Sequence, residues 1–321
     1  MSVLLEVKNL KKYYSVSGGT LHAVDDVSFT IEKGETLGVV GESGCGKSTL
    51  GKTILRLVPP TSGEILYDGK DLAQFSDREF TRLRPDLQMI FQDPMSSLNP
   101  RMSVKQQIEE PMLIYKTVPD RRKREQRVLE LMDTVGLARR YADMYPHELD
   151  GGRRQRIGIA RGLSLNPKLI ICDEPVSALD VLIQAQILNL LQDLQRDKGL
   201  TYMFITHDLS VVKHISHNIC VMYLGQVVEK CETKTLFSNT LHPYTKALLS
   251  AIPVPSLKNR RERILLKGEL ASPINPEDHC RFAPRCIYAT EECRNNPAPA
   301  LTDMGGGHLA ACHRCREINK L

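Results

Sequence analysis

The chain has no long apolar segment. No run of about eighteen apolar residues, the length that marks a membrane-spanning helix, occurs among its 321 residues. The N-terminus also lacks the charged and then apolar segments of a secretory signal. We therefore expect a chain that is neither inserted into a membrane nor exported by itself, and that works in the cytosol.

A large excess of one charge is missing as well. The formal net charge is only +5, and the densest basic cluster is Arg121 to Arg124. This cluster opens a predicted helix, where a solvated helix face explains it. The composition therefore gives no reason to expect nucleic acid as a partner.

What the chain does have is a glycine-rich loop after the apolar segment Thr36–Val40. The loop fits G-x-x-x-x-G-K-[ST] and consists of Gly41, Glu42, Ser43, Gly44, Cys45, Gly46, Lys47, Ser48 and Thr49. Glycines let backbone N–H groups turn around phosphate oxygens, and the helix that follows points its positive end at the same place. Lys47 adds a charge for the β- and γ-phosphates, and the Ser48 hydroxyl is placed to bind Mg²⁺.

Acidic residues follow a second apolar segment. Leu169–Cys172 ends in Asp173 and Glu174, as a buried parallel strand with catalytic groups at its carboxyl end does, although ordinary strand exits can look the same. Combined with the phosphate loop, Asp173 is suited to hold Mg²⁺ and Glu174 to deprotonate the attacking water. His207 follows the apolar segment Thr201–Thr206, and we expect it in the same layer, although a lone histidine is usually structural.

The wider pattern predicts an α/β fold built on a P-loop NTPase core. Alternating residues in Leu4–Leu10 and Ala23–Ile31 predict an antiparallel β-lobe, and a mostly helical pattern over about residues 95–162 predicts a helical insertion. We expect a nucleotide-binding domain over residues 1–251. Residues 252–321 are expected to form an irregular, cysteine-rich tail.

Two local expectations concern the flanks of the phosphate loop. The helix after the loop should run from Gly46 to about Val58, where Pro59-Pro60 stop it. Tyr13 and Tyr14 end the first predicted strand, and an aromatic face there could stack on adenine. Packing of a strand-edge aromatic against the sheet is an equal alternative.

Together these motifs resemble the ATP-binding subunit of ABC transporters, in order and spacing, over about residues 3–250. For the nucleotide, the resemblance implies Tyr14 as the adenine-stacking residue, Gly41–Thr49 as the Walker A loop, and Gln92 as the Q-loop residue and a further Mg²⁺ ligand. For hydrolysis, it implies Leu169–Asp173 as the Walker B strand, with Glu174 as the base that follows it. It also implies Ser177–Asp180 as the D-loop and His207 as the switch histidine.

A narrower resemblance is carried by two short segments and the cysteine tail. Tyr145-Pro146-His147-Glu148 and His242-Pro243-Tyr244-Thr245 look like the dipeptide and oligopeptide importer ATPases, closest to the second of their two ATPase subunits. The resemblance implies a heterodimer with a paralogous ATPase on the cytosolic face of the membrane. Its further partners would be two permease subunits and, indirectly, an extracytoplasmic peptide-binding protein.

One motif departs from the family. The family signature runs Leu-Ser-Gly-Gly-Gln, whereas here Leu149 is followed by Asp150, Gly151, Gly152 and Arg153. In the family this segment caps the γ-phosphate of the partner's site, so the carboxylate of Asp150 would face a phosphate. Two like charges about 4 Å apart, at an effective dielectric near 20, repel each other by about 4 kcal/mol. This is more than the helix dipole's favourable contribution of about 1 kcal/mol. Unless Arg153, Arg154 or Mg²⁺ neutralises the carboxylate, we expect this half-site to bind or hydrolyse ATP poorly. Alternatively, Asp150 serves only as the N-cap of the helix.

The tail holds five of the nine cysteines. Only Cys312 and Cys315 form a close C-x2-C pair, whereas zinc ribbons show such pairs at both ends. Thiolates from an irregular loop suit a [4Fe-4S] cluster, for which the predicted ligands are Cys280, Cys286, Cys293 and Cys312, with Cys315 as a spare or a replacement for Cys312. Zinc, or free or disulfide-bonded thiols, are the alternatives. The resemblance favours the cluster, because several peptide-importer ATPases have such a set.

Three functions compete. The first is ATP hydrolysis that powers peptide import, and the second is the same role in a nickel importer of the same subfamily. The third is a soluble ABC ATPase that acts on ribosomes or DNA. Such proteins usually carry two cassettes or a long coiled-coil insertion, and this chain has neither, which disfavours the third function.

Overall fold

The computed structural model describes residues 2–252, 263–266, 268 and 272–321. Over these residues, no helix combines the length and the apolar character needed to cross a bilayer. The chain forms two compact units that alternate along the sequence. The first unit takes its described residues from 3–31, 36–73 and 206–321, and the second from 2, 32–35 and 74–205.

The first unit contains a four-stranded β-lobe. Its strands are β1 (Val3–Val16), β2 (Gly19–Glu32), β4 (Ser62–Tyr67) and β5 (Lys70–Asp71), in the order β2-β1-β4-β5. Strands β1 and β4 are antiparallel, with Leu5 opposite Tyr67. The lobe was predicted, but β1 and β2 are longer than expected because Gly18 and Gly19, at φ 102° and 141°, make a tight turn that lets both strands run up to it.

A second sheet region of the first unit carries the core strand before the phosphate loop. It consists of β3 (Thr36–Val40), β9 (Asn218–Tyr223) and β10 (Gln226–Glu232). Strands β3 and β9 are parallel, and β9 and β10 are antiparallel. Every residue of β3 is buried, which agrees with its uninterrupted apolar sequence.

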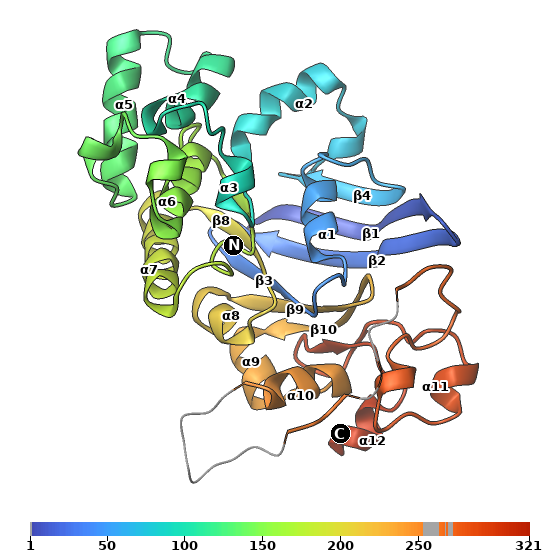
Figure 1. Ribbon diagram of the computed structural model, residues 1–321. Helices are drawn as coiled ribbons and strands as arrows, with labels where there is room; N and C mark the ends of the chain where they lie inside the picture. The colour runs from blue at the N-terminus through green and yellow to red at the C-terminus, as the bar shows by residue number, and fades with distance from the viewer. Residues whose placement is uncertain (1, 253–262, 267, 269–271) are drawn as a thin grey trace. The chain divides into compact units, whose positions relative to one another are not determined.

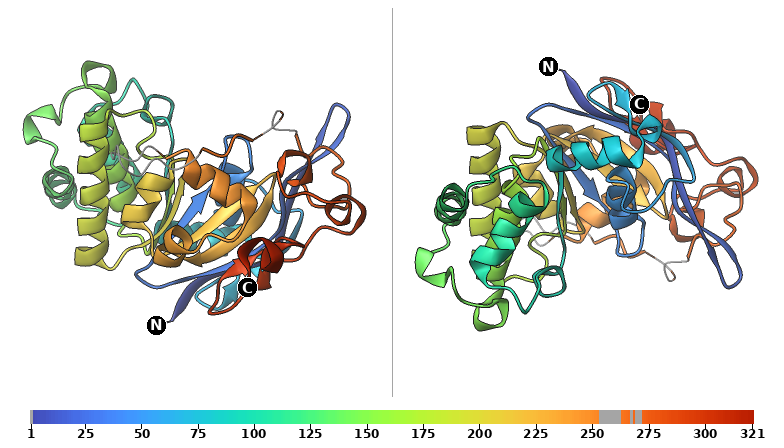
Figure 2. Two further views of the ribbon diagram at one scale, coloured as in Figure 1. Left: turned by 90° about the horizontal axis from the view of Figure 1, so that it is seen from below. Right: turned by 90° about the horizontal axis from the view of Figure 1, so that it is seen from above.

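The described part of the C-terminal tail is mostly irregular, as expected, but it also extends this sheet region. Strand β12 (Leu309–Ala310) pairs with β10, and β11 (Thr302–Asp303) pairs with β12. Two-residue strands are too short to leave a periodic pattern, so the sequence could not predict them. Figure 1 and Figure 2 show this segment, in orange and red, beside the strands it extends. Residues 253–262, 267 and 269–271 of the predicted tail lie outside the described residues.

The helices of the first unit are α1 (Lys47–Ile54), α8 (Leu209–Ile215), α9 (Thr233–Ser238), α10 (Pro243–Ser250), α11 (Glu292–Asn295) and α12 (Cys315–Asn319). The prediction that the first of these runs to Val58 is wrong. Arg56 takes a left-handed backbone with φ 49°, and the N–H of Leu57 bonds back to the carbonyl of Lys52 at 2.9 Å. This closing turn ends the helix before the prolines can.

The second unit is built on three parallel strands. They are β6 (Leu87–Ile90), β7 (Leu169–Asp173) and β8 (Thr201–Thr206), with β7 between the other two. Asp173, the last residue of β7, lies opposite Ile205 of β8. The two acids therefore leave the sheet at the carboxyl end of its middle strand, where parallel α/β folds place functional groups.

The second unit also contains α-helices. They are α2 (Asp77–Leu83), α3 (Pro94–Ser97), α4 (Val104–Ile114), α5 (Arg121–Thr134), α6 (Gly151–Leu163) and α7 (Val181–Lys198). Figure 1 shows α4, α5 and α6 side by side. Their contact faces are apolar: Val104, Ile108 and Met112 of α4 are fully buried. The segment for which a helical pattern was predicted therefore contains α3, α4, α5 and α6.

Candidate functional site

The glycine-rich loop connects β3 to α1 within the first unit. Gly44 and Gly46 have φ of 78° and 103°, values that residues with a Cβ adopt only at a cost. A Cβ on Gly46 would also lie 2.0 Å from the carbonyl oxygen of Ala23. Ser43 and Gly44 are exposed, so the loop presents its backbone N–H groups and the start of α1 to an anion.

Lys47 is placed inside this loop. Its side chain is 4% exposed, and its ammonium donates to the carbonyl oxygens of Gly41 at 2.8 Å and Glu42 at 2.9 Å. The next residue, Ser48, is half-buried at the start of α1. An ammonium and a hydroxyl at the first turn of the helix are the groups that phosphate and Mg²⁺ require.

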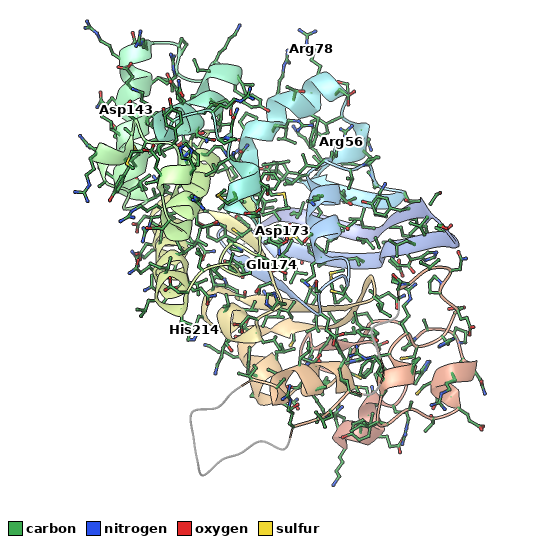
Figure 3. The ribbon with its side chains drawn as sticks, viewed as in Figure 1. Arg56, Arg78, Asp143, Asp173, Glu174 and His214 are labelled. Atoms are coloured by element: carbon green, nitrogen blue, oxygen red, sulfur yellow. The ribbon has the colours of Figure 1, made fainter. Side chains whose placement is uncertain are left out.

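The two acids follow each other at the end of β7, within the second unit (Figure 3). Asp173 is 3% exposed and Glu174 is 9% exposed. Glu174 has a left-handed backbone, with φ 46°, and its N–H bonds to the carbonyl of Ile205 at 2.9 Å. Such strain in a residue that is not glycine is typical of functional sites.

Gln92 approaches Glu174 from the loop after β6. Its Nε2 donates to Oε2 of Glu174 at 3.1 Å. The structure therefore brings together the predicted Q-loop residue and the predicted base, and Gln92 can hold the orientation of the carboxylate. Ser177 follows in the D-loop segment, and its hydroxyl donates to the carbonyl of Glu174 at 3.1 Å.

The signature segment lies at the start of α6. Asp150 caps the helix by accepting from the N–H of Arg153 at 2.8 Å, and the two side chains also form an ion pair. This arrangement fits the simple N-cap that the sequence left open, and it supplies a neutralising partner for the carboxylate. A Cβ on Gly152 would lie 2.7 Å from Cγ2 of Ile183, so this glycine is required by the packing of α6 against α7.

Asp150, Gly152 and Arg153 also line a cavity of about 320 Å³ in the second unit. Tyr141 also lines the cavity, and the guanidinium of Arg153 lies 4.9 Å from the centroid of the Tyr141 ring. The tyrosine face thus helps to hold the arginine that pairs with Asp150.

His207 directly follows β8 and is exposed. The next residue, Asp208, caps α8 by accepting from the N–H of Ser210 at 2.7 Å. The phosphate loop and His207 belong to the first unit, whereas Gln92 and the two acids belong to the second.

The two tyrosines of β1 have different surroundings. Tyr13 stacks on His22, with 3.9 Å between ring centroids, and its hydroxyl donates to Asp25. Tyr14 is half-buried, and the ammonium of Lys12 lies 4.6 Å from its ring centroid. Tyr13 is therefore occupied by packing within the lobe, and Tyr14 stays the candidate for adenine stacking.

The cysteines of the tail gather within the first unit. Burial is the largest cause of the raised pKa values of Cys280 and Cys286, and the thiolate of Cys293 adds to both shifts. The pKa of Cys312 rises to about 12, mainly through burial, with smaller contributions from Cys315, Cys280 and Cys286. All the predicted ligands therefore lie within electrostatic reach of others in the set.

Cys315 differs from them in its surroundings. It is 1% exposed, packs with Leu241 and Ala310, and accepts a hydrogen bond from Asn319 at 3.7 Å. Among the described residues, no group of three or more Cys, His, Asp or Glu side chains is arranged to hold a metal ion. The predicted cluster is therefore not confirmed.

Comparison with known proteins identifies the family. The family described as "ABC transporter" matches residues 24–177, and "Oligopeptide/dipeptide transporter, C-terminal region" matches residues 228–293. The oligopeptide transport ATP-binding protein AppF of Bacillus subtilis (strain 168) is 50% identical, over 97% of each chain. The chain belongs to the ATP-binding proteins of ABC transporters. The predicted recognition is thereby confirmed.

Further relatives and structures agree with membership of the ABC family. The dipeptide transport ATP-binding protein DppF of Haemophilus influenzae is 51% identical, over 96% of each chain. The dimeric ATP-binding cassette MJ0796, bound to ADP and Pi in a post-hydrolysis state, has 31% identity and a TM-score of 0.66, covering 72% of this chain and 99% of that chain. The cbiO1 protein of Clostridium perfringens, part of an ABC transporter complex, has 30% identity and a TM-score of 0.66, covering 74% of this chain and 92% of that one. The predicted fold, a P-loop ABC ATPase, is confirmed.

Sequence reasoning missed contacts that α10 and the tail make with the phosphate loop of this ABC protein. The carboxylate of Glu42 pairs with Arg285, and the N–H of Glu42 donates to the hydroxyl of Tyr244 at 2.9 Å. No periodicity or motif connects these positions, so no signal in one sequence could have found them.

Proposed function

We propose that this chain is the ATP-hydrolysing subunit of an ABC transporter that imports dipeptides or oligopeptides. The observation that carries the proposal is a phosphate loop and an ABC core in the same chain as a C-terminal region of the oligopeptide and dipeptide transporter type. Relatives of about half-identical sequence over nearly the whole chain are named as peptide transport ATP-binding proteins.

The residues of the site take the following roles in the proposal. The loop Gly41–Thr49 binds the phosphates of ATP, and Lys47 contacts the β- and γ-phosphates. Oxygen donors suit Mg²⁺, so Ser48, Gln92 and Asp173 would hold it, and the ion would neutralise charge on the transferred phosphate. Glu174 takes the proton of the attacking water, oriented by Gln92 and by the exposed His207.

The proposal places the chain on the cytosolic face of the membrane, as a peripheral subunit. A paralogous ATPase would complete the dimer, two permeases would carry the peptide, and an extracytoplasmic binding protein would deliver it. The nucleotide-binding domain would span residues 1–251, with a helical subdomain over about 95–162, and the extension would span 252–321. The exposed signature segment at Asp150 would cap the partner's nucleotide.

The dimer should be asymmetric. The site formed by this chain's phosphate loop, Glu174 and His207 would receive the partner's signature and do most of the hydrolysis. The site capped by Asp150 and Arg153 would be slower, because a carboxylate cannot donate a hydrogen bond to a phosphate as a serine hydroxyl can.

The tail would hold a [4Fe-4S] cluster on Cys280, Cys286, Cys293 and Cys312. Each of these thiols is near others of the set, and a cubane, whose irons each take one thiolate, tolerates wider ligand spacing than a single zinc ion. The cluster would supply a structural crosslink for a segment of irregular backbone. Cys315 is 1% exposed within a small core, whereas Cys312 packs against that core and stays partly exposed, which favours Cys312 as the ligand.

The cluster proposal predicts a colour. Protein purified without oxygen should be brown and should contain iron and sulfide, and Cys286→Ser should bleach it because one iron loses its thiolate. Cys231→Ser is the control, since that buried cysteine lies outside the set. A colourless wild-type protein with one zinc per chain would contradict the cluster.

The transport proposal is tested by co-expression with candidate permeases. The chain should fractionate with membranes only when the permeases are present. Co-sedimentation with ribosomes in the absence of permeases would favour the soluble alternative.

A further inference from the structure

The phosphate loop carries a negative charge where a polyanion has to bind. Glu42 is the second residue of the loop, and its carbonyl accepts from the ammonium of Lys47 at 2.9 Å. Burial is the main cause of the raised pKa of Cys45, and the Glu42 carboxylate adds a small part to it. An uncompensated carboxylate here would oppose the triphosphate.

Arg285 of the C-terminal extension compensates this charge. Its two terminal nitrogens meet the two oxygens of Glu42 at 2.6 Å and 3.0 Å, which is the bidentate geometry of a strong pair. The arginine side chain is 11% exposed and the glutamate side chain 27% exposed. The pair is therefore screened less by solvent than an ordinary surface ion pair.

The extension holds Arg285 against the loop through aromatic packing. Phe282 is 2% exposed and lies edge-on to Tyr223, with 5.2 Å between centroids. Tyr244 contacts both rings and accepts the hydrogen bond from the N–H of Glu42. Backbone and carboxylate of Glu42 are thus fixed by different elements of one packed cluster.

A second arginine anchors the same segment. Arg281 pairs with Asp25 and donates to the carbonyl of Leu224 at 2.6 Å. The segment 280–286 begins and ends with proposed cluster ligands, Cys280 and Cys286. It is therefore bonded to the β-lobe near one end, through Arg281, and to the phosphate loop near the other, through Arg285.

We propose that Arg285 is a positioning residue of the nucleotide site, which holds the phosphate loop open to ATP by neutralising Glu42. The inference rests on the proposed role of Gly41–Thr49 as the ATP loop. It makes the C-terminal extension part of the ATP site, acting from outside the loop itself. Disturbing the Arg285–Glu42 pair from the side of the extension should then change nucleotide affinity without any change in the loop sequence.

The test is equilibrium binding of MgATP and MgADP to the purified full-length chain. Arg285→Ala should weaken MgATP binding roughly tenfold, because the charge of Glu42 is left uncompensated within the loop that binds the triphosphate. MgADP, with less charge, should lose less. Arg285→Lys should recover part of the affinity, since it keeps the charge but not the bidentate geometry.

The decisive variant is the double substitution. Glu42→Gln combined with Arg285→Ala should return the MgATP affinity to within about twofold of wild type, because the opposing charge is gone. Arg314→Ala is the matched control, since it breaks an ion pair with Glu317 that lies within the extension. It should leave the affinity unchanged.

Each outcome has a meaning. The inference is wrong if Arg285→Ala binds MgATP with wild-type affinity. It is also wrong if the double variant recovers no affinity, because removing a charge would not restore a purely structural contact. Lys47→Ala separates this failure from that of the proposed ATP loop. If Lys47→Ala loses MgATP and Arg285→Ala does not, only the inference fails; if neither changes binding, the loop assignment fails with it.

Discussion

Glu174 has a left-handed backbone conformation, which is uncommon for a residue with a Cβ. Its φ of 46° comes directly after a regular strand, and its side chain meets the amide of Gln92. The N–H of Glu174 stays bonded to the neighbouring strand, so the strained residue remains anchored to the sheet. The sequence could predict the acid from its place after an apolar segment, but not this geometry.

Glu174→Gln should leave MgATP binding intact and nearly abolish turnover. The amide oxygen can still accept from Gln92, so the site keeps its geometry while the base is lost. Binding and turnover should be measured in the assembled transporter, with Glu291→Gln as a control at an exposed helix start. Near-normal hydrolysis by Glu174→Gln would overturn the role of this residue.

Lys47→Ala should instead weaken binding itself, by tenfold or more in Kd, as expected for the loss of a charged hydrogen-bond donor. Titration with MgATP measures this directly. An unchanged affinity would show that the ammonium does not contact the phosphates. The loop was predictable because its residues are adjacent in sequence, whereas Arg285 lies 243 positions from its partner Glu42.

At the scale of elements, long amphipathic and apolar segments were predicted well. The helix α5 begins at Arg121, where the basic cluster was predicted to open a helix. What the sequence could not predict depends on a few tertiary contacts, such as the early end of α1 or the short strands β11 and β12. A left-handed Arg56 and a two-residue pairing leave no periodic trace.

One helix start gives a pH-dependent prediction. His242 is fully buried before α10, and its Nδ1 accepts from the N–H of Tyr244 at 3.1 Å. Burial lowers the pKa of His242 from 6.5 to about 4, although the negative charge of Glu229 acts to raise it. Glu229 itself is buried and accepts from His308 at 2.8 Å and from the N–H of Leu241 at 2.7 Å.

The sign follows from which state binds the proton. Between pH 6.5 and about 4, His242 is protonated in the unfolded chain but not in the folded chain. The contribution of neutral His242 to the free energy of unfolding is therefore fully present above pH 6.5. It falls by up to about 3 kcal/mol as the pH drops to 4. His242→Asn keeps a capping oxygen and removes the titration. Its stability, measured by denaturant unfolding, should fall less over this window than that of wild type. Parallel curves would contradict the assignment.

For the whole molecule, the unusual signature makes a prediction about the assembled dimer. The ion pair of Arg153 with Asp150 supplies the neutralising partner that the carboxylate needs beside a phosphate. Arg153→Gln should therefore lower ATP occupancy at the partner's site. Adding Asp150→Ser, which restores the family pattern, should raise occupancy and turnover above those of wild type.

The readout for these variants is nucleotide occupancy at each site of the assembled transporter. The control is Arg139→Gln, which breaks an exposed ion pair with Asp133 elsewhere in the second unit. Identical occupancy in Arg153→Gln and wild type would show that this segment does not cap a phosphate.

The central claim, that ATP hydrolysis by this chain powers peptide import, is tested most directly by uptake into liposomes. The complete transporter, with its permeases, partner ATPase and binding protein, would be reconstituted with ATP on the side of the ATPases, and uptake of a labelled peptide measured. The account predicts ATP-dependent uptake that Glu174→Gln reduces to near background while MgATP still binds. Uptake that persists at the wild-type rate in Glu174→Gln, or ATP hydrolysis with no peptide uptake in the wild type, would contradict it.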